Sequence, residues 1–213
     1  MKFDVLTLFP EMFESMKESI IGRAIQNNLI EVNLINIRDF SKDKHKKVDD
    51  TVYGGGAGML IRPDVVYDSY KSVKKANSKV IYMSPQGKTL TQEKVVELSK
   101  EEHLIILCGH YEGIDQRVID KINPEEISIG DYVLTGGEIP AMVLIDSVSR
   151  YIEGVLADES ISEESFSRRS FGISTIYKTS WVWGYGSTWS FTIRSSWKYK
   201  KVEIKRVVKN NFK

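Results

Sequence analysis

The sequence predicts an α/β fold in which the strands of a parallel sheet alternate with helices. Segments rich in β-forming residues are followed by segments with apolar residues every three or four positions. The run LIILC that ends at Cys108 is typical of a strand buried on both faces. Three unusual loops follow strands, namely SPQG at 84–87, CGHYEG at 108–113 and IGDYVLTGGE at 129–138. Ligands bind at the carboxyl ends of parallel strands, so these loops also predict a site.

Strands and helices are expected to alternate along most of the chain. Strands are predicted at 3–9, 30–37, 79–84, 103–108 and 127–129. Helices are predicted from Pro10 to about 27, over 64–76, over 91–100, in a short stretch after Asp115, and over 137–151. The hydroxyl of Thr91 alone is expected to cap its helix, because Lys94 cannot complete a capping box.

The stretch from Ile129 to Arg150 organises the rest of the chain. Its glycines precede a helix whose three- and four-residue steps predict one apolar face, made of Ile139, Met142, Val143, Ile145, Val148 and Tyr151. Asp146 and Arg150 lie four residues apart and therefore share another face. Glycines let a ligand approach the main chain closely, although a tight turn between strand and helix explains them as well.

Two further segments leave alternatives open. The charged loop at 38–50 is explained by solvation or by contact with RNA phosphates. The glycine-rich stretch at 53–59 lacks the Lys-Ser/Thr of a P-loop, so a lid or a wall beside a ligand is the better interpretation. The dinucleotide fingerprint GxGxxG is absent from the loops, which disfavours a nucleotide held by its pyrophosphate.

Composition narrows the class of protein. The chain has 213 residues, 41% of them hydrophobic, which is enough for one large domain or one domain with a small appendage. No apolar run approaches a membrane span, and Asp4 disfavours a signal peptide, so a cytoplasmic location without a membrane partner is expected. The single Cys108 excludes an internal disulfide, and three scattered histidines predict no metal cluster.

Charge divides the chain into two unequal parts. Residues 1–164 carry 19 Lys and Arg against 28 Asp and Glu, whereas residues 165–213 carry 11 against one. All four tryptophans also fall in the second part. Such a break predicts either a nucleic-acid-binding tail or a tail whose sequence has been altered.

The motifs MSPQG, CGHYEGIDQR and SIGDYVLTGGE, together with LFPEMF and VDDTVYGGGAGM, closely resemble the bacterial tRNA (guanine-N1)-methyltransferases of the SPOUT superfamily. The resemblance covers 1–166. It implies a SPOUT-type parallel sheet with helices on both faces and a deep trefoil knot. It also implies transfer of a methyl group from S-adenosylmethionine to N1 of guanine 37 of tRNA, next to the anticodon, by a homodimer whose sites lie at the subunit interface. Magnesium dependence is suggested too, and DNA is not expected as a partner.

Carried over position by position, the resemblance implies a set of cofactor-binding residues in the three loops and at the end of the strand before the first of them: Tyr82, Met83, Ser84, Pro85, Gly109, Tyr111, Glu112, Ile129, Gly130, Asp131, Tyr132, Val133, Leu134, Gly136 and Gly137.

The resemblance also implies two catalytic residues. Guanine N1 carries a proton at neutral pH, so a carboxylate must remove it, and a cation near O6 would stabilise the developing negative charge. Arg150 is the implied cation and Glu164 the implied base. The family has Asp before its Ser-Phe pair where this chain has Glu164, and Glu163 competes for the role. Arg150 could instead pair with Asp146 one turn away.

The carboxyl-terminal sequence departs from the family after Ser167. The family continues with a stretch like DGLLEYPQYTRP and later has an SGHH motif. Allowed codons for residues 168–179, read one base later, spell DGLLEYPQYTRP, and the same shift over 190–202 permits VLLSGHHGNI followed by two basic residues and Trp. A change of reading frame near Ser167 is therefore predicted.

The predicted organisation is a knotted cofactor-binding domain at 1–160, a linker at 161–167 and an aberrant basic, Trp-rich tail at 168–213 in place of the family's small helical tRNA-reading domain. Besides the methyltransferase, two interpretations stay open. One is a catalytically impaired, cofactor-binding dimer. The other is a non-enzymatic protein whose tail stacks RNA bases.

Overall fold

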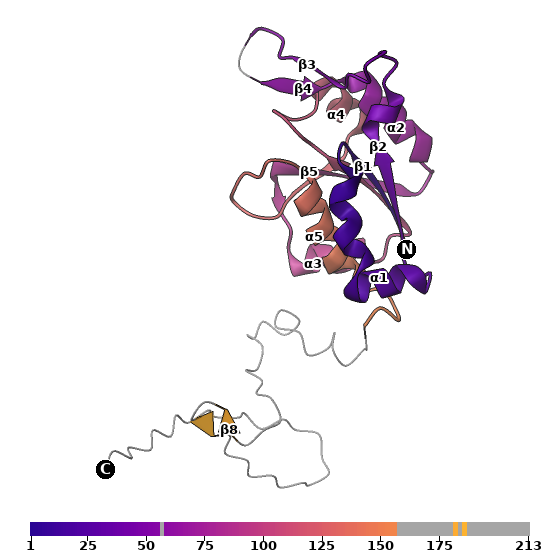
Figure 1. Cartoon of the computed structure of the whole chain (residues 1–213), viewed down its shortest axis with the longest axis vertical. Helices are drawn as coiled ribbons and strands as arrows, with labels where there is room; N and C mark the ends of the chain where they lie inside the picture. The colour runs from indigo at the N-terminus through magenta and orange to yellow at the C-terminus, as the bar shows by residue number, and fades with distance from the viewer. Residues whose placement is uncertain (56–57, 157–180, 183–184, 187–213) are drawn as a thin grey trace, which may run out of the picture.

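The computed structural model describes residues 1–55 and 58–156, together with 181–182 and 185–186 (Figure 1). Its centre is a sheet with the strand order β2-β1-β6-β5-β7, and every neighbouring pair in it is parallel. The strands are β1 (Lys2–Thr7), β2 (Glu31–Asn36), β5 (Ser78–Thr89), β6 (His103–Cys108) and β7 (Glu125–Ser128). The predicted α/β class with a parallel sheet is confirmed.

Helices cover both faces of this sheet (Figure 1). One face carries η1 (Pro10–Lys17), α1 (Ser19–Gln26), α3 (Gln92–Leu98) and α5 (Glu138–Ser149). The other carries η2 (Ile37–Phe40), α2 (Pro63–Val73) and α4 (Gln116–Ile122). All of β6 is buried, and it alternates Ile106 toward the first face with Leu107 toward the second, as predicted for a central strand.

Two small antiparallel pairs lie outside the main sheet. β3 (Asp49–Thr51) pairs with β4 (Met59–Ile61), and β8 (Trp181–Val182) pairs with β9 (Tyr185–Gly186). The glycine-rich segment at 53–59 thus connects the two strands of the β3–β4 hairpin, and its residues 56 and 57 lie outside the described part.

Two predicted boundaries were wrong. The helix expected from Pro10 to about residue 27 is divided between η1 and α1, because Glu18 is extended and Ser19 has a φ of 58°. The strand expected to end at residue 84 runs on to Thr89, with a register shift between Met83 and Lys88 where it pairs with β7. SPQG is therefore an irregularity within a strand that continues.

Two helix predictions had opposite outcomes. Thr91 Oγ1 accepts the backbone N–H of Lys94 at 3.3 Å, which confirms the cap by the hydroxyl. The single apolar face predicted for α5 is wrong, because Ile139 and Val143 are 46% and 41% exposed. The helix buries a different stripe against the sheet, made of Ala141, Leu144, Ile145 and Val148. The apolar residues of α5 therefore extend around more of the helix surface than the part that packs against the sheet.

A buried polar network joins the amino-terminal halves of four strands, β2, β1, β6 and β5. Asp4, only 2% exposed, lies with Oδ2 2.8 Å from Nε2 of His103, and its Oδ1 accepts from Nδ2 of Asn33 at 2.9 Å. The other ring nitrogen of His103 lies 2.8 Å from Oγ of Ser78. One carboxylate thus satisfies two side chains on neighbouring strands.

Replacing Asp4 with alanine is expected to lower the free energy of unfolding by about 3 kcal/mol, because His103 and Asn33 would lose their buried partner. Urea denaturation measures this change. The control is Glu14→Ala, which removes an exposed ion pair with Lys17 and should leave the midpoint nearly unchanged. Equal midpoints for the two variants would contradict a stabilising role of the network.

The predicted linker 161–167 and the tail 168–213, apart from β8 and β9, lie outside the described residues. That the family's small helical domain does not form here therefore stays a prediction. The knot stays a prediction from the resemblance. Among the helices that the structure describes, none is long and apolar enough to cross a bilayer.

Candidate active site

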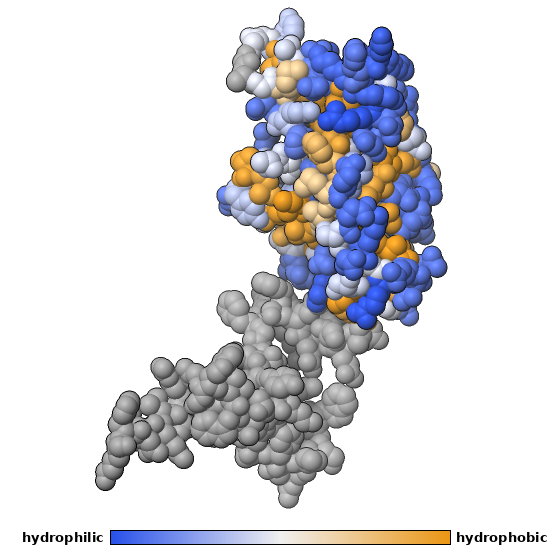
Figure 2. Space-filling view, viewed as in Figure 1, coloured by the Kyte–Doolittle hydropathy of each residue, from blue (hydrophilic) through white to orange (hydrophobic). Residues whose placement is uncertain are grey.

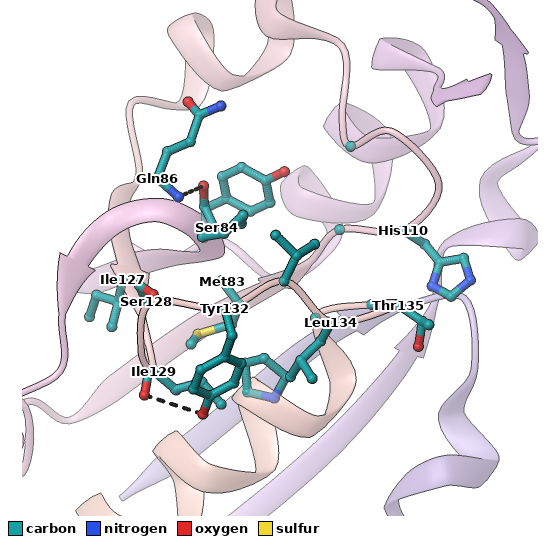
Figure 3. A pocket seen from close by; sticks show the side chains of 18 of the residues that line it. Met83, Ser84, Gln86, His110, Ile127, Ser128, Ile129, Tyr132, Leu134 and Thr135 are labelled. Atoms are coloured by element: carbon teal, nitrogen blue, oxygen red, sulfur yellow. Dashed lines mark hydrogen bonds between the residues drawn. The ribbon is translucent and has the colours of Figure 1, made fainter. Parts of the chain in front are cut away.

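A cavity of about 250 Å³ opens at the carboxyl edge of the sheet, where the irregular part of β5 meets the segments that follow β6 and β7 (Figure 3). All of the predicted cofactor residues line it except Gly130 and Asp131. The lining also includes residues that the sequence did not single out: Gln86, His110, Gly113, Ile127, Ser128, Thr135 and Pro140. All of these except Ile127 and Pro140 lie within the motifs already quoted, so the motifs themselves were the available signal.

The first wall comes from the irregular part of β5. The backbone N–H of Gln86 donates to Oγ of Ser84 at 3.2 Å, which closes a tight local turn (Figure 3). A Cβ on Gly87 would lie 2.5 Å from the backbone nitrogen of Ile127, so only glycine lets β5 approach β7 this closely. The bulge therefore positions Ser84 at the rim of the cavity.

The second wall is the segment after β6. A Cβ on Gly109 would lie 2.9 Å from Oη of Tyr82, which shows how closely this backbone approaches the opposite wall. Tyr111 has a φ of 59°, a left-handed backbone conformation that residues other than glycine rarely adopt. The backbone N–H of Glu112 donates to Met59 at 3.0 Å, which ties this segment to β4. Burial, followed by the negative charge of Glu126, raises the pKa of Tyr82.

The third wall is the segment between β7 and α5. Its Gly137 N–H donates to the carbonyl of Gly109 at 2.8 Å, and Gly136 forms a β-bridge with His110. On the other side of the cavity, the Tyr132 hydroxyl lies 3.5 Å from the carbonyl of Ile129 (Figure 3). The second and third walls are thus held together by main-chain contacts.

A buried carboxylate lies behind these two walls. Glu138, 1% exposed, accepts from Oγ1 of Thr7 at 2.9 Å, and its other oxygen lies 3.9 Å from Nδ1 of His110. Thr7 Oγ1 in turn accepts the backbone N–H of Phe9 at 3.0 Å. The contact joins the end of β1 to the start of α5, and the sequence analysis missed it. The only available signal was an acidic residue in the first turn of a largely apolar helix.

Cys108 provides a chemical probe of this packing. It is fully buried, and burial followed by the charge of Glu138 raises the pKa of its thiol. We expect a disulfide reagent at pH 8 to label the native protein on the order of 10³ times more slowly than the urea-unfolded protein, because labelling requires opening. Gly137→Ala should accelerate labelling, since its Cβ would lie 2.8 Å from Cα of Cys108. Similar native and unfolded rates would contradict the described packing.

Of the two implied catalytic residues, only Arg150 lies in the described part of the chain. Arg150 directly follows α5, twelve residues from Glu138, which corresponds to about 18 Å along a helix axis. It does not line the cavity. Its backbone N–H donates to the carbonyl of Asp146. Glu164 and its competitor Glu163 lie outside the described residues.

Comparison with known proteins adds the family. A sequence profile described as tRNA (Guanine-1)-methyltransferase TrmD matches residues 1–184. The chain belongs to this family. Its similarity to a protein of Ruminiclostridium cellulolyticum is 68% identity over 170 residues, which cover 78% of this chain and 73% of the relative. A Finegoldia magna protein is 61% identical over 167 residues (78% and 72%), and one from Clostridioides difficile is 56% identical over 172 (78% and 74%).

Each of these three relatives is named tRNA (guanine-N(1)-)-methyltransferase. The family resemblance inferred from the loop motifs is therefore confirmed. The match to the profile ends at residue 184, and the three alignments leave about a fifth of the chain unmatched. The change of reading frame near Ser167 stays a prediction.

Proposed function

We propose that the protein transfers a methyl group from S-adenosylmethionine to N1 of guanine 37 in tRNA. The observation that carries this proposal is the coincidence of the family's motifs with the walls of one cavity at the carboxyl edge of the sheet. Relatives that carry the corresponding activity in their names match this chain at up to 68% identity.

The residues present fit the cofactor. Gly109 and Gly137 line the cavity and have no side chains, so an adenosyl group can approach the main chain there. Apolar side chains such as Met83 and Ile129 line other parts of the wall. When bound, the cofactor supplies an electrophilic methyl group. The three walls would orient that group and exclude water.

Two side chains would act on the guanine. Glu164 would accept the N1 proton, and the guanidinium of Arg150 would stabilise the negative charge that develops toward O6. Glu164 has one more methylene group than the family's Asp, so its carboxylate would have to be positioned accurately against the guanine N1 proton. The family resemblance suggests magnesium dependence, but the described residues include no group of three or more His, Cys, Asp or Glu that could hold a metal ion, and no residue is assigned to one.

We further propose a homodimer in which the partner's Arg150 completes each site. The distance between Arg150 and the cavity within one chain supports this arrangement. So does an exposed apolar surface formed by Ile139, Val143 and Met12, all more than 40% exposed, on α5 and the adjacent η1. Figure 2 shows apolar residues gathered at the surface of this region. Such a patch is typical of an interface.

Sedimentation velocity at micromolar concentration is expected to show a dimer, and Val143→Asp should shift it toward monomer. The matched control is Glu93→Ala on the exposed side of α3. A monomeric wild-type chain would contradict the dimer. We also expect the protein to act in the cytoplasm, where its tRNA substrate is found.

A single-turnover assay with the protein in excess tests the proposed reaction. Labelled S-adenosylmethionine and a tRNA transcript with guanine at position 37 should give 1-methylguanosine on nucleoside digestion, and a transcript with adenine there should not. Methylation at another atom, or no product from protein that binds the cofactor, would contradict the proposal.

A further inference from the structure

We propose that residues 42–47 form a preorganised loop that binds the phosphate backbone of the tRNA beside the active site. This inference rests on the proposed function, because it assigns the tRNA a contact surface outside the cavity. The solvated loop is the competing explanation, and four features of the structure favour phosphate binding.

The first feature is a local excess of positive charge. Residues 1–156 carry 19 Lys and Arg against 24 Asp and Glu, so this part of the chain as a whole repels a polyanion. Residues 42–47, with the sequence KDKHKK, instead carry a net positive charge, from four lysines and one aspartate. A polyanion approaching the described part of the molecule would therefore find an attractive segment here.

The second feature is the rigid shape of the loop. Asp43 Oδ1 accepts the backbone N–H of His45 at 2.7 Å and that of Lys47 at 3.3 Å, and Ser41 Oγ donates to the carbonyl of Lys47 at 2.6 Å. Lys46 holds a left-handed φ of 56°. Val48, fully buried, anchors the end of the loop in the core. A loop fixed in this way presents its side chains without a large cost in conformational entropy.

The third feature is the availability of its cations. The one acidic side chain of the loop, Asp43, is directed at backbone N–H groups, and these hydrogen bonds lower its pKa. Lys42 and Lys47 form long ion pairs of 3.8 Å with Asp68 and Asp50. Lys44 and Lys46 are exposed and form no ion pair with any residue that the structure describes.

The fourth feature is the position of the loop. It follows η2 at the carboxyl end of β2, which is the edge of the sheet that carries the cavity. The carbonyl of Val48 accepts from Arg62 at 2.8 Å, and the preceding residue Ile61 donates to Gly113 in the cavity wall at 3.0 Å. Figure 1 shows the β3–β4 hairpin that connects these segments. Only β4 separates the loop from the wall of the site, so an RNA with a base in the cavity would pass near the lysines.

The experiment compares two double variants of the full-length chain that remove the same charge. Lys44→Ala/Lys46→Ala changes the loop. Lys75→Ala/Lys100→Ala changes exposed lysines that precede β5 and β6, at the opposite edge of the sheet. Affinity for labelled tRNA is measured by fluorescence anisotropy at several KCl concentrations. The basic tail is the same in every chain, so the comparison between variants reports on the loop.

We expect the loop variant to bind tRNA about tenfold more weakly at 100 mM KCl and to lower the slope of log affinity against log salt by about 1 to 2, which corresponds to one or two lost phosphate contacts. The control variant should bind within about twofold of wild type. Equal losses in both variants, or no loss in the loop variant, would overturn the proposal.

Two parallel readouts separate this proposal from the proposed function. Cofactor affinity, measured without tRNA, should be the same in all three chains, because none of the four lysines lines the cavity. If the wild-type chain forms no 1-methylguanosine but the loop variant alone loses tRNA affinity, the proposed reaction fails and the loop stands. If methylation occurs and the loop variant binds tRNA like wild type, the loop fails and the reaction stands.

Discussion

The Gly109→Val variant is expected to bind S-adenosylmethionine at least about a hundredfold more weakly than the wild type. A Cβ at this position would already lie 2.9 Å from Oη and 3.1 Å from Cε2 of Tyr82, and valine adds two methyl groups. Tyr82 is partly buried and packs against the core, so its ring cannot easily move away. The cofactor and the valine side chain would therefore compete for the same space. Equilibrium dialysis with labelled cofactor measures the affinity.

Gly109→Ala should give an intermediate loss, because it adds only the first of these atoms. Thr51→Val, an isosteric change at an exposed position of β3, is the control and should bind normally. Circular dichroism must show that each variant is folded. Undiminished binding by folded Gly109→Val would exclude this cavity as the cofactor site.

Restoring the predicted reading frame after Ser167 is expected to raise the rate of tRNA methylation at least about a hundredfold. The shifted frame spells DGLLEYPQYTRP and permits SGHH, two family motifs that the present sequence lacks. The resemblance implies that the family's carboxyl-terminal domain reads the tRNA, and under the proposed reaction the segment after Glu164 would also hold this carboxylate against the guanine. The present tail, with 11 basic residues and one acidic residue over 165–213, would instead bind RNA through phosphates without positioning it.

Cofactor affinity should not change on restoration, because every described residue that lines the cavity precedes the altered segment. Sequencing of the gene around the Ser167 codon checks the premise independently. Equal methylation by the two chains would contradict the interpretation of the tail.

The sequence predicted the features of this fold that depend on local pattern. The run ending at Cys108 could be identified as a central strand because its side chains are apolar toward both faces. The motifs around Ser84, Gly109 and Gly137 could be placed together because parallel strands bring their carboxyl ends to one edge. The observed cavity joins these loops.

Features that depend on tertiary contact could not be predicted. Glu138 and Thr7 lie 131 positions apart, and no periodicity relates them. The continuation of β5 through Gly87 depends on close packing against the backbone of β7, which leaves no room for a side chain at this position. The helical period predicts that Ile139 and Val143 share an apolar face with Ile145 and Val148, because the period shows only which residues are apolar. Packing decides which of them the core buries, and Ile139 and Val143 stay exposed.

Calorimetric titration of S-adenosylmethionine into the full-length chain tests the central claim most directly, since the claim is that the three loops form a cofactor site whatever the sequence of the tail. We predict saturable binding of one cofactor per chain. No heat of binding at millimolar cofactor, with protein shown to be folded by circular dichroism, would contradict the account.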